Sequence, residues 1–68
     1  MINNSTYTKI LKNLNILYIE DEKKIKENIK KTLLLFCENI FDAESIKIAK
    51  NKLLNNRIDI IISDINLP

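Results

Sequence analysis

The sequence has no histidine among its 68 residues and only one cysteine, Cys37. Without histidine, the mixed Cys/His ligand sets of zinc sites are excluded. A lone cysteine has no partner for an internal disulfide, which suits a reducing compartment. Because free cysteine is among the most buried residue types, we expect Cys37 to be a small apolar side chain inside the fold.

Glycine is also absent, and the one proline is Pro68. No Pro/Gly-rich linker and no internal repeat divides the chain, and 68 residues allow one small domain. A chain of this length buries only about 60% of the surface that its unfolded form exposes, so its core is marginal. Hydrophobic residues make up 46% and charged residues 29%, which is typical of a folded segment and excludes disorder.

Long hydrophobic runs are missing as well. The longest, residues 33–37, is far shorter than the roughly 20 residues that cross a bilayer, and residues 1–15 lack the apolar segment of a signal peptide. We therefore expect a soluble, cytoplasmic protein without membrane contact. The 11 Lys and Arg exceed the 9 Asp and Glu by too little to indicate a nucleic-acid-binding surface.

What the sequence does contain, after a polar leader at residues 1–13, is an alternation of short apolar runs and helical periods. Residues 16–19 are four apolar residues in a row, which predicts a buried strand. From residue 22 to about residue 36, apolar side chains recur at steps of four, four and three, which predicts an amphipathic helix. Asp21 and Glu22 at its start suit the positive end of the helix dipole. Its apolar face consists of Ile25, Ile29, Leu33 and Phe36.

The same alternation repeats once. Residues 39–43 predict a second strand, and Ser45 is a candidate N-cap for a second helix. We expect that helix to stop at Asn55 and Asn56, because asparagine tolerates the left-handed conformation of a helix end. Its apolar face consists of Ile46, Ala49 and Leu53.

Residues 58–63 give the strongest strand signal. Their three consecutive isoleucines point alternately to opposite sides, so both faces of this strand must be buried, as in a parallel sheet covered by helices. The order β-α-β-α-β predicts right-handed crossovers and an α/β fold. Since only five residues follow, we also expect this strand to lack a partner on one side.

Acidic residues follow two of the predicted strands: Glu20 and Asp21 after residues 16–19, and Asp64 after residues 58–63. Each has a plain interpretation alone, as a helix start or a turn former. Together they matter because ligands of open α/β sheets bind beyond the carboxyl ends of strands. If the two strands are neighbours, three carboxylates meet at one edge, where a pair about 4 Å apart repels by roughly 4 kcal/mol at an effective dielectric of 20. Mg²⁺ would relieve that repulsion, leaving Asp64 as a nucleophile that forms an acyl phosphate.

These segments resemble the receiver domain of two-component response regulators. ILYIEDE (residues 16–22) is similar to the first strand of the family with its acidic pair. DIIISDINLP (residues 59–68) is similar to the phosphorylation strand, in which an acceptor Asp precedes a Pro by four residues, as Asp64 precedes Pro68. DAESIKIAKNKLLNNR (residues 42–57) resembles the second helix, although Ile46 stands where glycine is common.

The resemblance covers residues 14–68 and implies the N-terminal portion of a doubly wound, flavodoxin-like parallel sheet, truncated to β-α-β-α-β with strand order 2-1-3. It implies Asp64 as the phosphoacceptor and also a Mg²⁺ ligand, Asp21 as a direct Mg²⁺ ligand and Glu20 as a ligand acting largely through water. Asn66 would bind the metal through its backbone carbonyl, and its side chain would lie beside the phosphoryl group. The implied partner is a sensor histidine kinase or a phosphotransfer protein, without nucleic-acid contact.

In the family, a fourth strand ends in a Ser or Thr that senses the phosphate, and a fifth ends in a Lys that pairs with it. Neither element is present in these 68 residues, so we expect weak Mg²⁺ binding, impaired phosphorylation and no proper switch. Two explanations stay open: the chain is a piece of a longer protein, or two copies associate through the edge of the third strand.

Two other functions compete with phosphate acceptance. A degenerate receiver would use the same fold as a protein-interaction module without phosphotransfer. An enzyme is disfavoured, because phosphohydrolases with a nucleophilic Asp and metal-dependent nucleases both need a second Asp where Asn66 stands.

Overall fold

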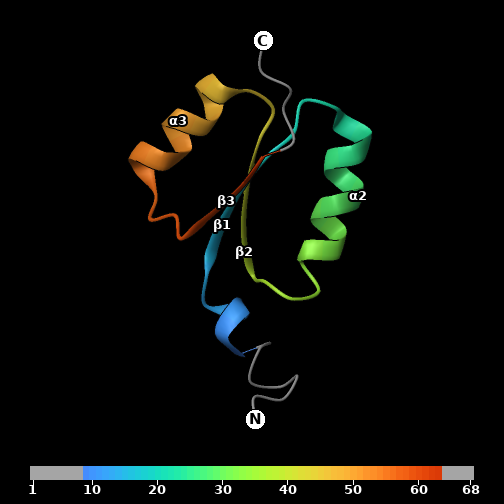
Figure 1. The fold of residues 1–68 in the computed structure, drawn as a ribbon, viewed down its shortest axis with the longest axis vertical. Coiled ribbons are helices and arrows are strands. Elements are labelled where there is room, and N and C mark those ends of the chain that lie inside the picture. The colour runs from blue at the N-terminus through green and yellow to red at the C-terminus, as the bar shows by residue number, and fades with distance from the viewer. Residues whose placement is uncertain (1–8, 64–68) are drawn as a thin grey trace.

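The computed structural model describes residues 9–63. A helical turn at residues 9–12 precedes a three-stranded parallel sheet with the order β2-β1-β3, and the rest of the expected leader lies outside the described residues. The predicted α/β fold and strand order 2-1-3 are confirmed, and α2 and α3 lie on opposite sides of the sheet (Figure 1). The elements are β1 (Asn15–Ile19), α2 (Lys23–Leu33), β2 (Asn39–Ala43), α3 (Ile46–Asn55) and β3 (Ile60–Ser63).

The central strand β1 forms the core. It pairs with a strand on each side, so its apolar residues from Ile16 to Ile19 are all buried. Leu17 and Ile19 face α3, where the small side chains of Ala43 and Ala49 let the helix approach the sheet closely. Burying each large side chain of this kind stabilises a fold by about 1.5–3 kcal/mol. Phe41, Ile46, Ile48 and Ile58 pack around this cluster.

Helix α2 covers the other face less completely. It ends at Leu33, three residues earlier than predicted, and turns at residues 34–36 lead to Cys37, which is buried as expected. Glu22 is the N-cap residue but makes no side-chain capping bond. Ile25 and Ile29 remain partly exposed, because no other described element packs over this side of α2. An ion pair from Lys30 to Asp42, 3.1 Å long, ties the helix to β2.

Helix α3 starts as predicted and stops differently. The Ser45 hydroxyl accepts a hydrogen bond from the Ile48 N–H at 3.2 Å, which confirms the N-cap. The expected left-handed stop is wrong, because Asn56 is extended (φ −139°, ψ 149°). The Asn56 backbone N–H and side-chain amide both donate to the Lys52 carbonyl. This carbonyl in the last turn of α3 is therefore hydrogen-bonded without a left-handed residue.

Strand β3 starts two residues later than predicted, at Ile60, and the expectation that both its faces are buried is wrong. Ile60 is 38% exposed and Ile61 is 50% exposed. The reason is that β3 pairs only with β1 and forms the edge of the described sheet, beyond the cover of α2 and α3.

Neither α2 nor α3 has the length and hydrophobicity of a membrane-crossing helix, and the same holds for the rest of residues 9–63.

Replacing Ser45 by Ala removes the hydroxyl that accepts the Ile48 N–H. We expect the free energy of unfolding, measured by urea denaturation, to fall by about 0.5–2 kcal/mol. Ser45→Asp keeps a side-chain oxygen at the cap and should retain most of the stability. Equal losses in the two variants would contradict a capping role.

The Lys30–Asp42 pair predicts a pH dependence of stability. Partial burial raises the pKa of Asp42, but the hydrogen bond from Lys30 and the charges of Lys30 and Lys26 outweigh it, so this pKa lies below its usual value. A carboxyl with a lowered folded pKa stabilises the fold above its unfolded pKa of about 3.9, and that contribution is lost as the pH falls through the folded pKa.

Asp42→Asn should therefore lower the free energy of unfolding by about 0.2–1 kcal/mol at pH 7, the range for a partly exposed pair. The difference from the unmodified chain should shrink as the pH falls below the usual Asp pKa of about 3.9, because Asp42 is then protonated first in the unfolded and later in the folded state. Lys31→Gln, which removes an exposed neighbouring charge, serves as the control. A difference that persists undiminished at low pH would refute this assignment.

Candidate functional site

The carboxyl ends of all three strands lie in a row. Ile19, the last residue of β1, is opposite Ala43 at the end of β2 and opposite Ser63 at the end of β3. The condition on which the predicted site depends, that the first and third strands are neighbours, is therefore met. Glu20 and Asp21 follow β1 at this edge, and the chain continues from Ser63 to Asp64.

Glu20 is a buried acidic side chain, only 3% exposed. Its backbone N–H donates to the Ala43 carbonyl at 2.9 Å, which extends the pairing of β1 and β2 by one residue. Its Oε2 accepts the backbone N–H of Glu22 at 3.2 Å, so the carboxylate folds back over the turn into α2. Burial of an acidic group is unfavourable unless hydrogen bonds or a cation compensate it, which makes this residue a candidate for a functional role.

Asp21 occupies the bend between Glu20 and the N-cap of α2, and it is exposed. Consecutive residues thus offer one buried and one solvent-accessible carboxylate at the same strand end. The buried carboxylate accepts the Glu22 backbone N–H, while the exposed one is accessible to an ion from solvent.

The other two predicted site residues, Asp64 and Asn66, lie outside the described residues. The meeting of Glu20, Asp21 and Asp64 therefore stays a prediction. Residues 9–63 by themselves contain no group of three acidic, histidine or cysteine side chains placed to hold a metal ion, and they enclose no pocket.

The donor atoms at this edge suit a hard cation. Glu20 and Asp21 offer only carboxylate oxygens, the ligands that Mg²⁺ prefers. Cys37, the one thiol of the chain, follows α2 and lies between its end and β2, so no soft ligand competes at the carboxyl edge of β1.

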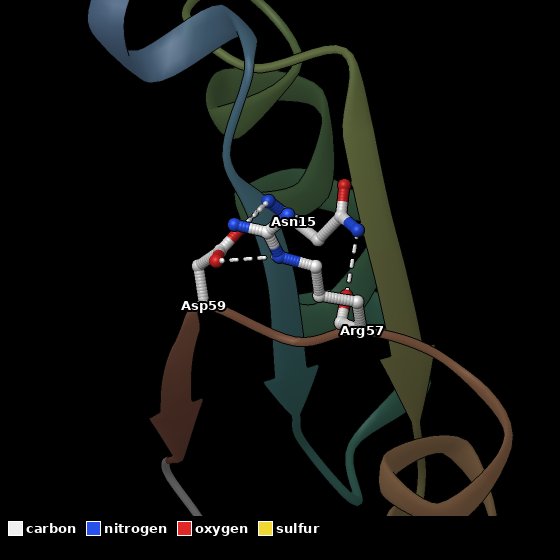
Figure 2. Close-up of polar contacts among 3 residues, drawn as sticks. All are labelled: Asn15, Arg57 and Asp59. Carbon is white, nitrogen blue, oxygen red and sulfur yellow. Dashed lines mark hydrogen bonds and ion pairs between the residues drawn. The ribbon is translucent and has the colours of Figure 1, made fainter.

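A polar network that sequence reasoning missed joins the opposite ends of the same two strands (Figure 2). The Asn15 backbone N–H donates to Asp59 Oδ2 at 2.9 Å, and the Asp59 N–H donates to the Asn15 carbonyl at 2.8 Å. The Asn15 side-chain amide donates to the Arg57 carbonyl at 2.6 Å, and Arg57 Nε lies 3.4 Å from Asp59 Oδ1. Asn15 stands just before the first predicted strand and Asp59 is near the start of the third, and this pair of polar residues is the signal that could have pointed to the contact.

This network, here called the Asn15–Asp59 clamp, sets the register of β1 and β3. A slip of one residue would turn every side chain of β3 to the other face of the sheet. With the clamp at the start, four pairs along the strands bring Ser63 opposite Ile19. The clamp therefore positions the chain that leads to Asp64, although it lies at the other edge of the sheet.

Comparisons of this chain with family models, with curated proteins and with solved structures find no match.

The clamp predicts a contrast between two substitutions. Asp59→Ala removes the acceptor of the Asn15 N–H and should lower the free energy of unfolding by about 1–2 kcal/mol. Arg57→Gln removes only an ion pair whose arginine side chain is 85% exposed, and should change it by less than about 0.5 kcal/mol. Both are measured by chemical denaturation, and an equal loss in Arg57→Gln would show that the ion pair, not the hydrogen bond, holds the strands in register.

Proposed function

We propose that this chain is the N-terminal portion of a receiver domain that accepts a phosphoryl group on Asp64 with the help of Mg²⁺. The observation that supports it most is the parallel pairing of β1 with β3, which ends with Ser63 opposite Ile19. At that end, β1 leads into a buried and an exposed carboxylate, and Asp64 is the next residue after Ser63. Parallel strands that end together are where α/β sheets bind ligands.

The proposed reaction is a transfer from a phosphohistidine of a sensor kinase or a phosphotransfer protein. A carboxylate oxygen of Asp64 attacks phosphorus and forms the O–P bond of an acyl phosphate. The P–N bond to histidine breaks, and its electron pair stays on the imidazole nitrogen, which takes up a proton. Such partners place the protein in the cytoplasm.

Each of the other residues has a separate proposed task. Asp21 binds Mg²⁺ directly, Glu20 acts through water, and Asn66 contributes its backbone carbonyl. When bound, the metal neutralises charge on the phosphoryl oxygens. The burial of Glu20 and the hydrogen bond from the Glu22 backbone N–H support the indirect role, because they hold its carboxylate against the protein, whereas exposed Asp21 is accessible to an ion.

A protein-interaction module without phosphotransfer is the second candidate. Its support is the partial exposure of apolar side chains on α2 and β3, which suits contact with another protein surface. The two functions differ in one respect: phosphate acceptance requires Mg²⁺ and Asp64, and the interaction module requires neither.

The phosphoacceptor proposal predicts slow, Mg²⁺-dependent labelling of Asp64 by acetyl phosphate. The label is measured by intact-protein and peptide mass spectrometry. Asp64→Asn should abolish the label. Asp21→Asn should weaken Mg²⁺ binding by about tenfold or more, read from amide NMR shifts during a Mg²⁺ titration. Labelling should be impaired because the Ser/Thr and Lys of a complete receiver are not in these residues.

The matched control is Glu38→Gln, which changes an exposed carboxylate just before β2, at the opposite edge of the sheet and outside the Asn15–Asp59 clamp, and should leave Mg²⁺ binding unaltered. Absence of Mg²⁺-dependent shifts at Glu20 and Asp21, together with absence of label, would favour the interaction module. Rapid, complete labelling of Asp64 would contradict the expected impairment.

A further inference from the structure

An ion pair joins helix α2 to strand β2 close to the carboxyl edge of the sheet. Lys30 Nζ lies 3.1 Å from Asp42 Oδ2, and the two side chains are 35% and 32% exposed, so the pair is partly shielded from water. Asp42 lies opposite Tyr18 in the register and directly precedes Ala43, the last residue of β2. The pair therefore anchors the helix one residue before the end of this strand.

The end of β2 also holds the first acidic residue of the proposed site. The Ala43 carbonyl accepts the Glu20 backbone N–H at 2.9 Å, and Glu20 Oε2 accepts the backbone N–H of Glu22 at 3.2 Å. Glu22 is the N-cap of α2, and its carbonyl accepts the Lys26 N–H at 2.9 Å as the helix begins. The Glu20 backbone is thus bound to the end of β2, and its carboxylate is bound to the start of α2.

These contacts form a closed ring. It runs from Asp42 through Lys30 and along α2 to the N-cap, then through Glu20 and back to the end of β2. Helix α2 runs from this edge along the sheet (Figure 1), and Lys30 lies eight residues after the N-cap, about 12 Å along a helix that rises 1.5 Å per residue. Because each turn of a helix is hydrogen-bonded to the next, a shift at Lys30 is carried to the N-cap.

Packing holds α2 in place only weakly. No residue of this helix is buried, and Ile25 and Ile29 on its apolar side are 39% and 42% exposed. Buried apolar contacts are what usually fix the position of a helix on its sheet. The position of α2, and with it that of the Glu20 carboxylate at its N-cap, therefore depends on the ion pair.

We infer that the Lys30–Asp42 pair positions the Glu20 carboxylate and thereby contributes to Mg²⁺ affinity. Both are positioning residues, since they act through α2 and the turn at residues 20–22 and are not themselves proposed ligands. The inference rests on the proposed function for the metal, but it does not require Asp64 to accept a phosphoryl group.

The sign of the effect separates positioning from direct electrostatics. Lys30→Met removes a positive charge, and the weaker repulsion of the cation would by itself raise Mg²⁺ affinity. Loss of position acts the other way, because a displaced Glu20 carboxylate contributes less to binding. We expect Lys30→Met to raise the Mg²⁺ dissociation constant by about two- to fivefold, the coupling that a partly exposed ion pair supports.

The measurement is a titration of the 68-residue chain with Mg²⁺, followed by amide NMR shifts. Lys31→Met is the matched control, because it removes the same charge at the next, exposed position of α2 and should not weaken Mg²⁺ binding. Lys30→Arg keeps the charge and should restore the affinity of the unmodified chain. If the pair acts as a unit, Lys30→Met combined with Asp42→Asn should weaken binding no more than Lys30→Met alone.

Hydrogen exchange gives a second readout that needs no metal. The Glu22 amide donates to the Glu20 carboxylate, so it reports directly on the position of that group. In Lys30→Met this amide should exchange about two- to fivefold faster, because the turn opens more often. Its rate should be unchanged in Lys31→Met.

An unchanged or raised Mg²⁺ affinity in Lys30→Met would overturn the inference. So would an unchanged exchange rate of the Glu22 amide, or an equal loss of affinity in Lys31→Met. Absence of label on Asp64 with these effects intact would count against the phosphoacceptor proposal alone. Absence of Mg²⁺ binding to the unmodified chain would count against both.

Discussion

Across the start of β1 and β3, Asn15 and Asp59 exchange two hydrogen bonds, and the arrangement at the far end of both strands depends on this contact. It joins residues 44 apart in the sequence and fixes the register that brings Ser63 opposite Ile19. The buried face of β1, the exposed isoleucines of β3 and the place where the chain reaches Asp64 all follow from that register. A polar contact at one edge thus determines the geometry of the proposed chemistry at the other.

Sequence reasoning recovered the elements because their signals are local. The continuous apolar run of β1 and the period of about 3.6 in the helices identified strand and helix segments, and Ser45 indicated the start of α3. The conformation at the end of α3 was predicted wrongly, because Asn56 donates to the Lys52 carbonyl from an extended conformation. Residue preference does not distinguish this ending from a left-handed one. The Asn15–Asp59 clamp was not predicted, because it depends on pairing between segments that are distant in the sequence.

Burial was harder to predict than pattern. Three consecutive isoleucines correctly indicate a strand with two apolar faces, but the pattern does not say which other elements cover them. In residues 9–63 the two helices lie over the inner part of the sheet, so β3 is apolar and still exposed. Helix α2 shows the same limit, because Ile25 and Ile29 of its predicted apolar face are partly exposed and Phe36 lies beyond the end of the helix. Of the predicted site, the adjacency of β1 and β3 and the position of Glu20 at their common edge followed from topology.

The long separation of Asn15 and Asp59 also has a consequence for the order of events during synthesis. The central strand emerges from the ribosome early, but the residues that complete its second side are made 44 positions later. Until then β1 has only β2 as a neighbour, and non-local strand pairing must wait for the chain that supplies it. The nascent chain therefore passes through a stage in which its most apolar strand is half covered, when binding by a chaperone would matter most.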